Sequence, residues 1–151
     1  MILAEYNTTS FSDFTLFCGD STNIMSQLES QFDMIFADPP YFLSTGNGMV
    51  NINGKYIKFD KGEWDKVRTS EEKDRFNLSW LTLCKRCLKD NGTIWVSGTY
   101  HNIFSVANCM ELLGYNILNF IVWHKLDPPH SLTDKRFDFS AEYILWASKY
   151  K

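Results

Sequence analysis

The stretch that decides the fold is Met34-Ile35-Phe36-Ala37-Asp38-Pro39-Pro40-Tyr41. Four apolar residues are followed by an acid and two prolines, and a proline has no backbone N–H with which to continue a strand ladder. The run is therefore typical of a buried strand that ends at Asp38. Ligands of open α/β sheets bind at the carboxyl ends of the strands. We therefore expect a carboxylate and an aromatic ring at the ligand-binding edge of a sheet.

The groups that follow this strand suit a flat ligand that carries an amine. The Asp38 and Pro39 carbonyl groups have no strand partner beyond this point, and the Asp38 carboxylate adds further acceptors. Tyr41 places a flat ring beside them. This combination fits the exocyclic amine of adenine or cytosine, bound at its edge and stacked on its face. The simpler interpretation is that Pro39 and Pro40 only end a strand.

The motif Asp38-Pro39-Pro40-Tyr41 resembles that of the DNA amino-methyltransferases with a D-P-P-Y sequence. The likeness is greatest to the permuted, beta-type class of restriction-modification adenine-N6 methyltransferases, in which the motif stands near the N-terminus. The resemblance extends from about Phe14 to Lys149. It implies an α/β fold, with a Rossmann-like, mostly parallel sheet and flanking helices, and S-adenosylmethionine as the cofactor.

The residues before the motif predict a parallel β-α-β unit. Residues 14–18 are strand-like, Gly19-Asp20 closes that strand, and apolar residues at helical spacing lead to the strand at 32–37. Such a crossover places Asp20 at the same sheet edge as Asp38. In the family that the motif resembles, a Gly-Asp pair lies near the adenine of S-adenosylmethionine, which implies a cofactor role for Asp20. A turn with a helix N-cap is the alternative.

The long stretch at 42–68 has no sustained periodicity and is rich in glycine. Loops of this length inside a compact domain are usually functional or disordered. A small hairpin is predicted around Asn53-Gly54, where Lys55 and Lys58 make the chain locally basic. With the family resemblance we expect these lysines to contact DNA, and without it an ordinary solvated hairpin is the better interpretation. Trp64 is expected to anchor the end of the loop.

The second half of the chain predicts two more helices alternating with strands. A capping pattern at Thr69 or Ser70 begins a helix that ends at Asn91-Gly92. The expected strands lie at 93–97, 116–123 and 143–147, with a helix at 103–113 before the second of them. The residues that match the family in this part are Trp123, Lys125, Pro129, Glu142, Ile144 and Leu145. The resemblance implies that Lys125 contacts the substrate, although Asp127 stands where the family usually has asparagine.

The four cysteines do not predict a disulfide framework or a metal site. Cys84 and Cys87 have C-x-x-C spacing, but both lie on the apolar stripe of their helix, so core packing is the favoured interpretation. Two more ligands for zinc are not found at a suitable spacing, and His124 and His130 are interpreted as polar loop residues. No signal peptide precedes the cysteines, and we expect reduced thiols in the cytoplasm of a prokaryote.

The region that would complete the family's fold is not found in these 151 residues. The permuted class continues with a target-recognition region and a Phe-x-Gly-x-Gly-like loop around the cofactor methionine. We therefore expect a single catalytic-half domain at 1–151, an incomplete methyltransferase fold that is a fragment or one piece of a split enzyme. A net charge of −3 is low for a complete DNA-binding protein. The expected partners are DNA, a missing C-terminal half or second subunit, and a second copy of the chain; no stretch is apolar enough to span a membrane.

The predicted reaction is transfer of a methyl group from S-adenosylmethionine to adenine N6 in DNA. The catalytic residues implied by the resemblance are Asp38, Pro39, Pro40 and Tyr41. The implied cofactor contacts are Asp20, Asp38 and Pro39, and the implied substrate contacts are Tyr41, Phe42, Lys55, Lys58 and Lys125. Methylation of cytosine N4 is the alternative reaction, although enzymes of that type more often have serine in place of Asp38; RNA is a weaker alternative substrate. A non-catalytic partner subunit or remnant is the alternative from a different functional class.

Overall fold

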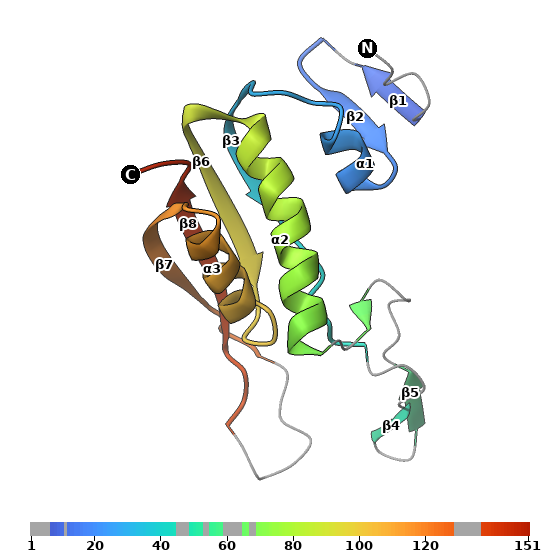
Figure 1. Ribbon diagram of the computed structural model, residues 1–151. Helices are drawn as coiled ribbons and strands as arrows, with labels where there is room; N and C mark the ends of the chain where they lie inside the picture. Colours follow the sequence, from blue (N-terminus) through green and yellow to red (C-terminus); the bar gives the residue numbers. More distant parts are fainter. Residues whose placement is uncertain are drawn as a thin grey trace.

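The computed structural model describes residues 7–10, 12–44, 49–52, 55–58, 65–66, 69–128 and 137–151 (Figure 1). Strands alternate with helices along most of the chain, which confirms the predicted α/β class. The elements in chain order are β1 (Asn7–Ser10), β2 (Thr15–Cys18), α1 (Ser21–Met25), β3 (Phe32–Ala37), β4 (Met49–Ile52), β5 (Lys55–Lys58), α2 (Ser70–Cys87), β6 (Leu88–Gly98), α3 (Ile103–Leu112), β7 (Asn116–His124) and β8 (Ala141–Ser148).

A four-stranded sheet with the order β3-β6-β8-β7 forms the centre of the molecule. β3 and β6 are parallel, whereas β8 runs antiparallel to both of its neighbours, so this part of the sheet is mixed. No helix separates β7 from β8, and strands joined without a crossover helix pair antiparallel. α3 provides the crossover between β6 and β7, which lie in the same direction on either side of β8.

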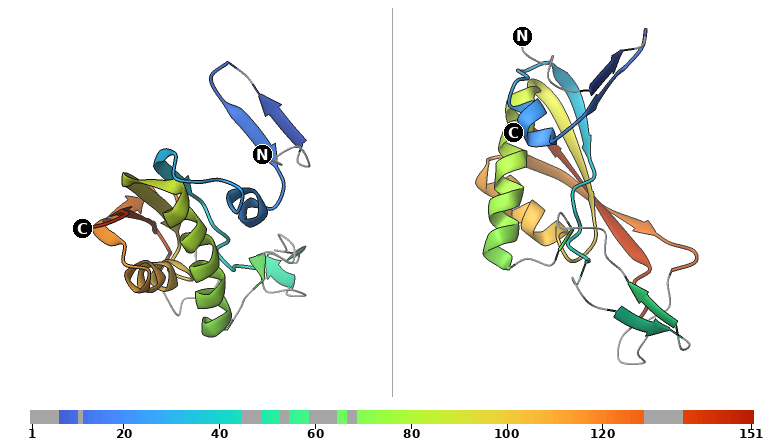
Figure 2. Two further views of the ribbon diagram at one scale, coloured as in Figure 1. Left: turned by 45° about the horizontal axis from the view of Figure 1, so that its top comes forward. Right: turned by 90° about the vertical axis from the view of Figure 1, so that its right-hand side faces the viewer.

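Both long helices cover the same face of the sheet, as the right-hand view of Figure 2 shows. α2 begins with a capping box in which Thr69 Oγ1 accepts from the Glu72 backbone N–H at 3.2 Å and Glu72 accepts from the Thr69 N–H at 2.9 Å. These bonds satisfy donors that a helix start otherwise leaves free. The core beneath the helices includes Leu81, Ile94, Val96, Val106, Met110 and Leu145, each 0–1% exposed.

The two cysteines of the C-x-x-C pair lie in this core, as the apolar stripe predicted. Cys84 is 2% exposed and Cys87 is 0% exposed, and burial raises the pKa of the Cys84 thiol to about 12. The helix itself ends at Cys87, four residues earlier than Asn91-Gly92 suggested. Gly92 belongs to β6, where an added Cβ would lie 2.9 Å from the Lys89 carbonyl oxygen and 3.0 Å from that of Phe32.

The predicted parallel β-α-β unit at the start of the chain is wrong. β2 pairs with β1 in an antiparallel hairpin, and no described strand pairs with the outer edge of β3. Figure 1 shows this hairpin standing apart from the sheet. A four-residue strand finds its backbone partners more readily in a neighbour a few residues away than across a crossover. Phe14 and Leu16 remain 53% and 57% exposed, so β2 is not part of the core.

The face of the sheet opposite the helices is uncovered by any described helix. We call it the open face, and it consists of the alternate residues Met34, Phe36, Trp95, Trp123, Ile144 and Trp146. Met34, Phe36 and Trp123 are 57–59% exposed. The indoles of Trp95 and Trp146 stack with centroids 4.9 Å apart. The Trp146 Nε1–H is buried and has no acceptor among the described residues. A contiguous apolar face with side chains this exposed usually contacts another layer of protein.

The predicted hairpin in the long loop is present as β4 and β5, which are antiparallel with Ile52 opposite Lys55. It lies away from the sheet in Figure 1. The side chains of Lys55 and Lys58 are outside the described part, as are Trp64, Pro129 and His130. None of the helices in the described ranges is long and apolar enough to cross a membrane.

Candidate functional site

The Asp38 carboxylate is held at the end of β3 by groups from two parts of the chain. The parallel register pairs Ala37 with Val96, which brings the next residues, Asp38 and Ser97, side by side. Ser97 Oγ donates to Asp38 Oδ1 at 2.6 Å, and the Tyr41 hydroxyl donates to the same oxygen at 2.6 Å. Asp38 Oδ2 accepts no hydrogen bond from the described residues. One carboxylate oxygen is therefore held by two donors, and the other has no donor among the described residues.

Tyr41 remains a donor over the whole physiological pH range. Burial, followed by the hydrogen bond to Asp38, raises the pKa of its hydroxyl to about 12. The ring is partly exposed, and its hydroxyl also lies 3.5 Å from Ser97 Oγ. Tyr41 therefore has both a ring for stacking and a hydroxyl that fixes that ring relative to Asp38.

The two proline carbonyl groups of the motif differ in their partners. Asn102 Nδ2 donates to the Pro40 carbonyl oxygen at 3.1 Å. No hydrogen bond to the Pro39 carbonyl oxygen is found among the described residues. The acceptors left for a ligand are thus the Pro39 carbonyl and Asp38 Oδ2, which is the pair that an exocyclic amine with two hydrogens requires.

Phe42 lies in a different environment from Tyr41. Its ring is 1% exposed and meets the Phe76 ring of α2 edge-on, with centroids 5.6 Å apart. Its φ of 56° lies in the left-handed region, which is unusual for a bulky residue. The buried Asp65 holds this conformation, since its Oδ1 accepts from the Phe42 N–H at 2.8 Å. A stacking role for Phe42 would require its ring to leave this contact, whereas the ring of Tyr41 is partly exposed.

A cavity of about 520 Å³ adjoins the motif on the α2 side of β3. Its lining includes the polar residues Asp20, Thr22 and Asp38 and the apolar residues Met25, Ile35, Phe76 and Trp80. This volume is in the usual range for small-molecule sites. The expected proximity of Asp20, Asp38 and Pro39 is thus present, although β2 does not join the sheet.

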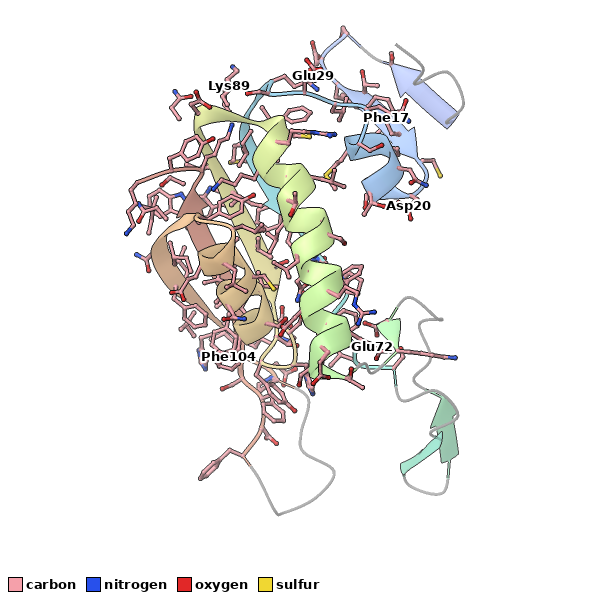
Figure 3. All side chains as sticks on the ribbon, in the orientation of Figure 1. Phe17, Asp20, Glu29, Glu72, Lys89 and Phe104 are labelled. Carbon is pink, nitrogen blue, oxygen red and sulfur yellow. The ribbon has the colours of Figure 1, made fainter. Side chains whose placement is uncertain are left out.

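Asp20 occupies the N-cap of α1. Its Oδ1 accepts from the backbone N–H groups of Thr22 at 2.9 Å and Asn23 at 3.0 Å. The bond from the Thr22 hydroxyl, with these backbone bonds, lowers the pKa of the Asp20 carboxyl. Figure 3 shows its side chain at the start of α1 on the side facing α2. The N-cap interpretation is therefore correct, and the same residue also lines the cavity.

Lys125 lies at the carboxyl-end edge of β3 and β6 and forms an ion pair with Glu142. Glu142 directly precedes Tyr143, which pairs with Gly98 at the end of β6, so this ion pair lies at the same edge of the sheet as Ser97. The backbone of Lys125 is held by Ser140, whose carbonyl oxygen accepts from its N–H at 2.7 Å.

Three buried or partly buried positions that hold the motif were missed in the sequence: Asp65, Ser97 and Asn102. Their partners are 23 to 62 residues away, and only Ser97 has a local signal, because it ends a strand.

The fold is that of solved DNA methyltransferases. The structure matches PvuII DNA methyltransferase (cytosine-N4-specific) with a TM-score of 0.62 and 16% identity, over 87% of this chain and 47% of that one. It matches the M1.HpyAVI–SAM complex with a TM-score of 0.52 and 20% identity, over 85% of this chain and 48% of that one. The site is therefore set in a methyltransferase fold.

Sequence comparison establishes the family. A family model described as DNA methylase matches residues 32–151. The type II methyltransferase M2.DpnII of Streptococcus pneumoniae is 48% identical over 131 residues, which are 86% of this chain and 48% of that protein. M2.LlaDCHI of Lactococcus lactis subsp. cremoris is 50% identical over 131 residues, with the same coverage. M2.MboI of Moraxella bovis is 40% identical over 151 residues, which are 99% of this chain and 55% of that protein. The chain belongs to the DNA methylase family, as the motif predicted, and it spans about half the length of these relatives.

Proposed function

We propose that this chain is the catalytic half of a type II DNA methyltransferase that uses S-adenosylmethionine to methylate adenine at N6. The observation that carries the proposal is the pair of open acceptors, Asp38 Oδ2 and the Pro39 carbonyl, beside a partly exposed tyrosine ring at the mouth of a cavity. The relatives named as type II methyltransferases support the reaction class.

The cavity fits part of the cofactor. Its apolar walls suit an adenine ring, and a carboxylate such as Asp20 suits the hydroxyl groups of a ribose. Asp20 has only one oxygen engaged in capping α1, which leaves Oδ2 to accept a further bond. S-adenosylmethionine, when bound, supplies an electrophilic methyl group on a sulfonium ion. Asp20, Asp38 and Pro39 are the residues that would hold it on this side.

The motif is arranged to orient the attacking amine. An adenine flipped out of the duplex would stack on Tyr41 and donate its two amine hydrogens to Asp38 Oδ2 and the Pro39 carbonyl. Accepting both hydrogens withdraws the nitrogen lone pair from the ring and directs it out of the ring plane. Positioning and electrostatic stabilisation then provide most of the rate enhancement. Lys125, Lys55 and Lys58 are proposed to contact the DNA backbone, for which lysine is suited.

The rest of the enzyme is proposed to dock on the open face and at the edge of β3 that no described strand pairs with. The chain spans about half of its relatives, and Met34, Phe36 and Trp123 are more than half exposed on that face. A C-terminal half, or a second subunit that supplies it, would cover these apolar groups and enclose the methionine end of the cofactor. The isolated chain is expected to self-associate through the same surface. Its expected place of action is the prokaryotic cytoplasm, on DNA.

Two alternative functions can be distinguished from adenine-N6 methylation by identifying the methylated base that is formed. Cytosine N4 has the same amine geometry, and one structural neighbour is named as cytosine-N4-specific. A non-catalytic subunit is the alternative from a different functional class, and it would yield no methylated base.

The test uses the complete protein, in which residues 1–151 are joined to a C-terminal half taken from the adjoining gene sequence or, where the gene provides none, from M2.DpnII. Methylated DNA is digested to nucleosides and analysed by mass spectrometry. We expect N6-methyladenine from the wild type and at least an approximately hundredfold loss of rate in Asp38→Ala.

Asp33→Ala is the matched control, since Asp33 lies on the same strand but forms a surface ion pair with Lys89 at 2.8 Å. Its rate should stay within about twofold of the wild type. N4-methylcytosine as the product would replace the adenine assignment. Absence of any methylated base from the complete protein would support the non-catalytic function.

A further inference from the structure

A buried chain of hydrogen bonds joins the wall of the cavity to the catalytic motif. Trp80 Nε1 donates to Asn77 Oδ1 at 3.1 Å, Asn77 Nδ2 donates to Asn102 Oδ1 at 2.8 Å, and Asn102 Nδ2 donates to the Pro40 carbonyl oxygen at 3.1 Å. Asn77 and Asn102 are 0% and 1% exposed, and Trp80 is 5% exposed. Trp80 lines the cavity. The chain therefore begins at the proposed cofactor site and ends within the motif.

The side chain of Asn102 forms hydrogen bonds that are unusual for an asparagine at a helix N-cap. It is the N-cap of α3, where an asparagine side chain normally accepts from the N–H groups of its own helix. Here the side chain makes no capping bond, and its amide is directed to Pro40 and Asn77 instead. The start of α3 thus forgoes a stabilising interaction, which is typical of positions where function opposes local stability.

The orientation of the two asparagine side-chain amides in this hydrogen-bond chain follows from its first donor, the Trp80 indole. An indole N–H is only a donor, so Asn77 must present its oxygen to Trp80 and its nitrogen to Asn102. Asn102 must then present its oxygen to Asn77 and its nitrogen to Pro40, whose carbonyl is only an acceptor. Asn77 Nδ2 also donates to Ser105 Oγ at 2.9 Å, and Ser105 in turn donates to Asp74. Because the polar groups of the chain are paired, the amides have one arrangement that satisfies them.

We propose that Asn102 and Asn77 are positioning residues that fix the backbone of the motif and orient it relative to the cavity. With the Pro40 carbonyl occupied, the Pro39 carbonyl is the one left to accept from the target amine. The prolines fix φ at both positions, so pinning one carbonyl restricts the whole turn from Asp38 to Tyr41. The role of the Pro39 carbonyl and the second test below rest on the proposed function, whereas the first test does not.

The first test needs no catalysis and uses residues 1–151. Hydrogen exchange is measured at the amides of Tyr41 and Phe42 in the wild type, in Asn102→Ala and in Asn116→Ala. Loss of one buried hydrogen bond should speed exchange at these two amides about tenfold in Asn102→Ala, with the central amides of β6 unchanged. Asn116 is the matched control, because its partly buried amide bonds only Ser148 Oγ, at 3.3 Å, in the described part of the chain and away from the motif.

A second variant covers the case in which Asn102→Ala does not fold, as judged by circular dichroism. Trp80→Phe keeps an aromatic ring in the core and removes only the N–H that sets the direction of the amides. It should speed exchange at Tyr41 and Phe42 in the same direction. Unchanged exchange at these amides in each folded variant, or a uniform increase over α2 and β6 as well, would overturn the proposal and leave the network as core structure.

The second test measures steady-state methylation by the complete protein. Asn102→Ala should lower kcat by about ten- to hundredfold, the effect expected of a small misplacement of reacting groups, with the KM for the cofactor within about twofold. A role in overall folding alone would reduce the amount of active enzyme and leave the KM values and the local exchange pattern as in the wild type. If the wild-type protein does not methylate DNA, the proposed function fails, and the exchange experiment still decides whether Asn102 positions the motif.

Discussion

The carboxyl end of β3 and the turn between β2 and α1 each present an aspartate to the same cavity, and the two are held by different kinds of contact. Asp38 accepts from Ser97, which is 59 residues away on the neighbouring strand. Asp20 accepts from Thr22 and Asn23, the first residues of its own helix. A local contact of this kind forms wherever the helix forms, whereas the Asp38 contact exists only when the sheet is assembled. Asp38 also accepts a local bond from Tyr41, so it depends on both the assembled sheet and its own turn, whereas the described contacts of Asp20 are all local.

The largest effect outside Asp38 itself is expected for the ring next to it. Tyr41→Ala removes the stacking surface, which is worth about 1–3 kcal/mol per base, so kcat/KM for methylation should fall by about ten- to hundredfold with a smaller change in DNA affinity. Tyr41→Phe keeps the ring and loses only the bond to Asp38, and it should retain most of the activity. Equal turnover in wild type and Tyr41→Ala would remove the stacking role.

A smaller effect is expected when the long-range contact of Asp38 is broken. Ser97→Ala removes one of the two donors to Oδ1 while Tyr41 keeps the other, so kcat should fall about tenfold. Ser97→Thr retains the hydroxyl and should restore most of the rate. Ser148→Ala, on a neighbouring strand and away from the motif, is the matched control. If Ser97→Ala had the same rate as the wild type, Asp38 would need no orientation from β6.

The smallest effect is expected at Asp20 and depends on pH. Its pKa is lowered in the folded chain, chiefly by the Thr22 hydroxyl, from an ordinary value of 3.8. The ionised cap therefore contributes its full stability above that value and loses it as the pH falls through the lower folded value. Asp20→Asn caps equally well and does not titrate, so its stability should change less than that of the wild type between pH 5 and pH 2, measured by urea unfolding.

A second variant at this position, Asp20→Ala, tests whether Asp20 binds the cofactor as well as capping α1. Asp20→Ala should weaken binding of S-adenosylmethionine by the complete protein, measured by calorimetry, and leave DNA affinity nearly unchanged. Equal cofactor affinity in wild type and variant would reduce Asp20 to a helix cap.

The features predicted from the sequence are those with short-range causes. The prolines after Asp38 predicted the end of β3, the pattern at Thr69 predicted the start of α2, and Asn53-Gly54 predicted the β4–β5 hairpin. The apolar runs at 93–97 and 143–147 predicted the strands β6 and β8. In each case the cause lies within a few residues and does not depend on the final fold.

The features that were missed depend on partners distant in sequence. Nothing in residues 14–18 distinguishes a strand that pairs with β1 from one that pairs with β3. Asn102 has the appearance of a helix cap, and its real partners, Asn77 and Pro40, become neighbours only when α2, α3 and β3 pack. Asp65 likewise clamps Phe42 across a 23-residue loop. Because hydrogen bonds of this type carry no periodicity, a single sequence contains no signal for them.

The tryptophans of the open face, including the stacked indoles of Trp95 and Trp146, are expected to give spectroscopic signals that depend on what covers this face. Two indoles whose centroids lie 4.9 Å apart are close enough for their excited states to couple, so we expect them to contribute a paired signal to the circular dichroism spectrum in the far ultraviolet. Trp123 on the same face is 57% exposed, so its emission is expected to be that of a solvated indole. Any layer of protein that covers this face displaces water from Trp123 and shifts its emission to shorter wavelength. The tryptophan emission of the protein can therefore be used, without an added label, to follow whether another layer of protein covers the open face.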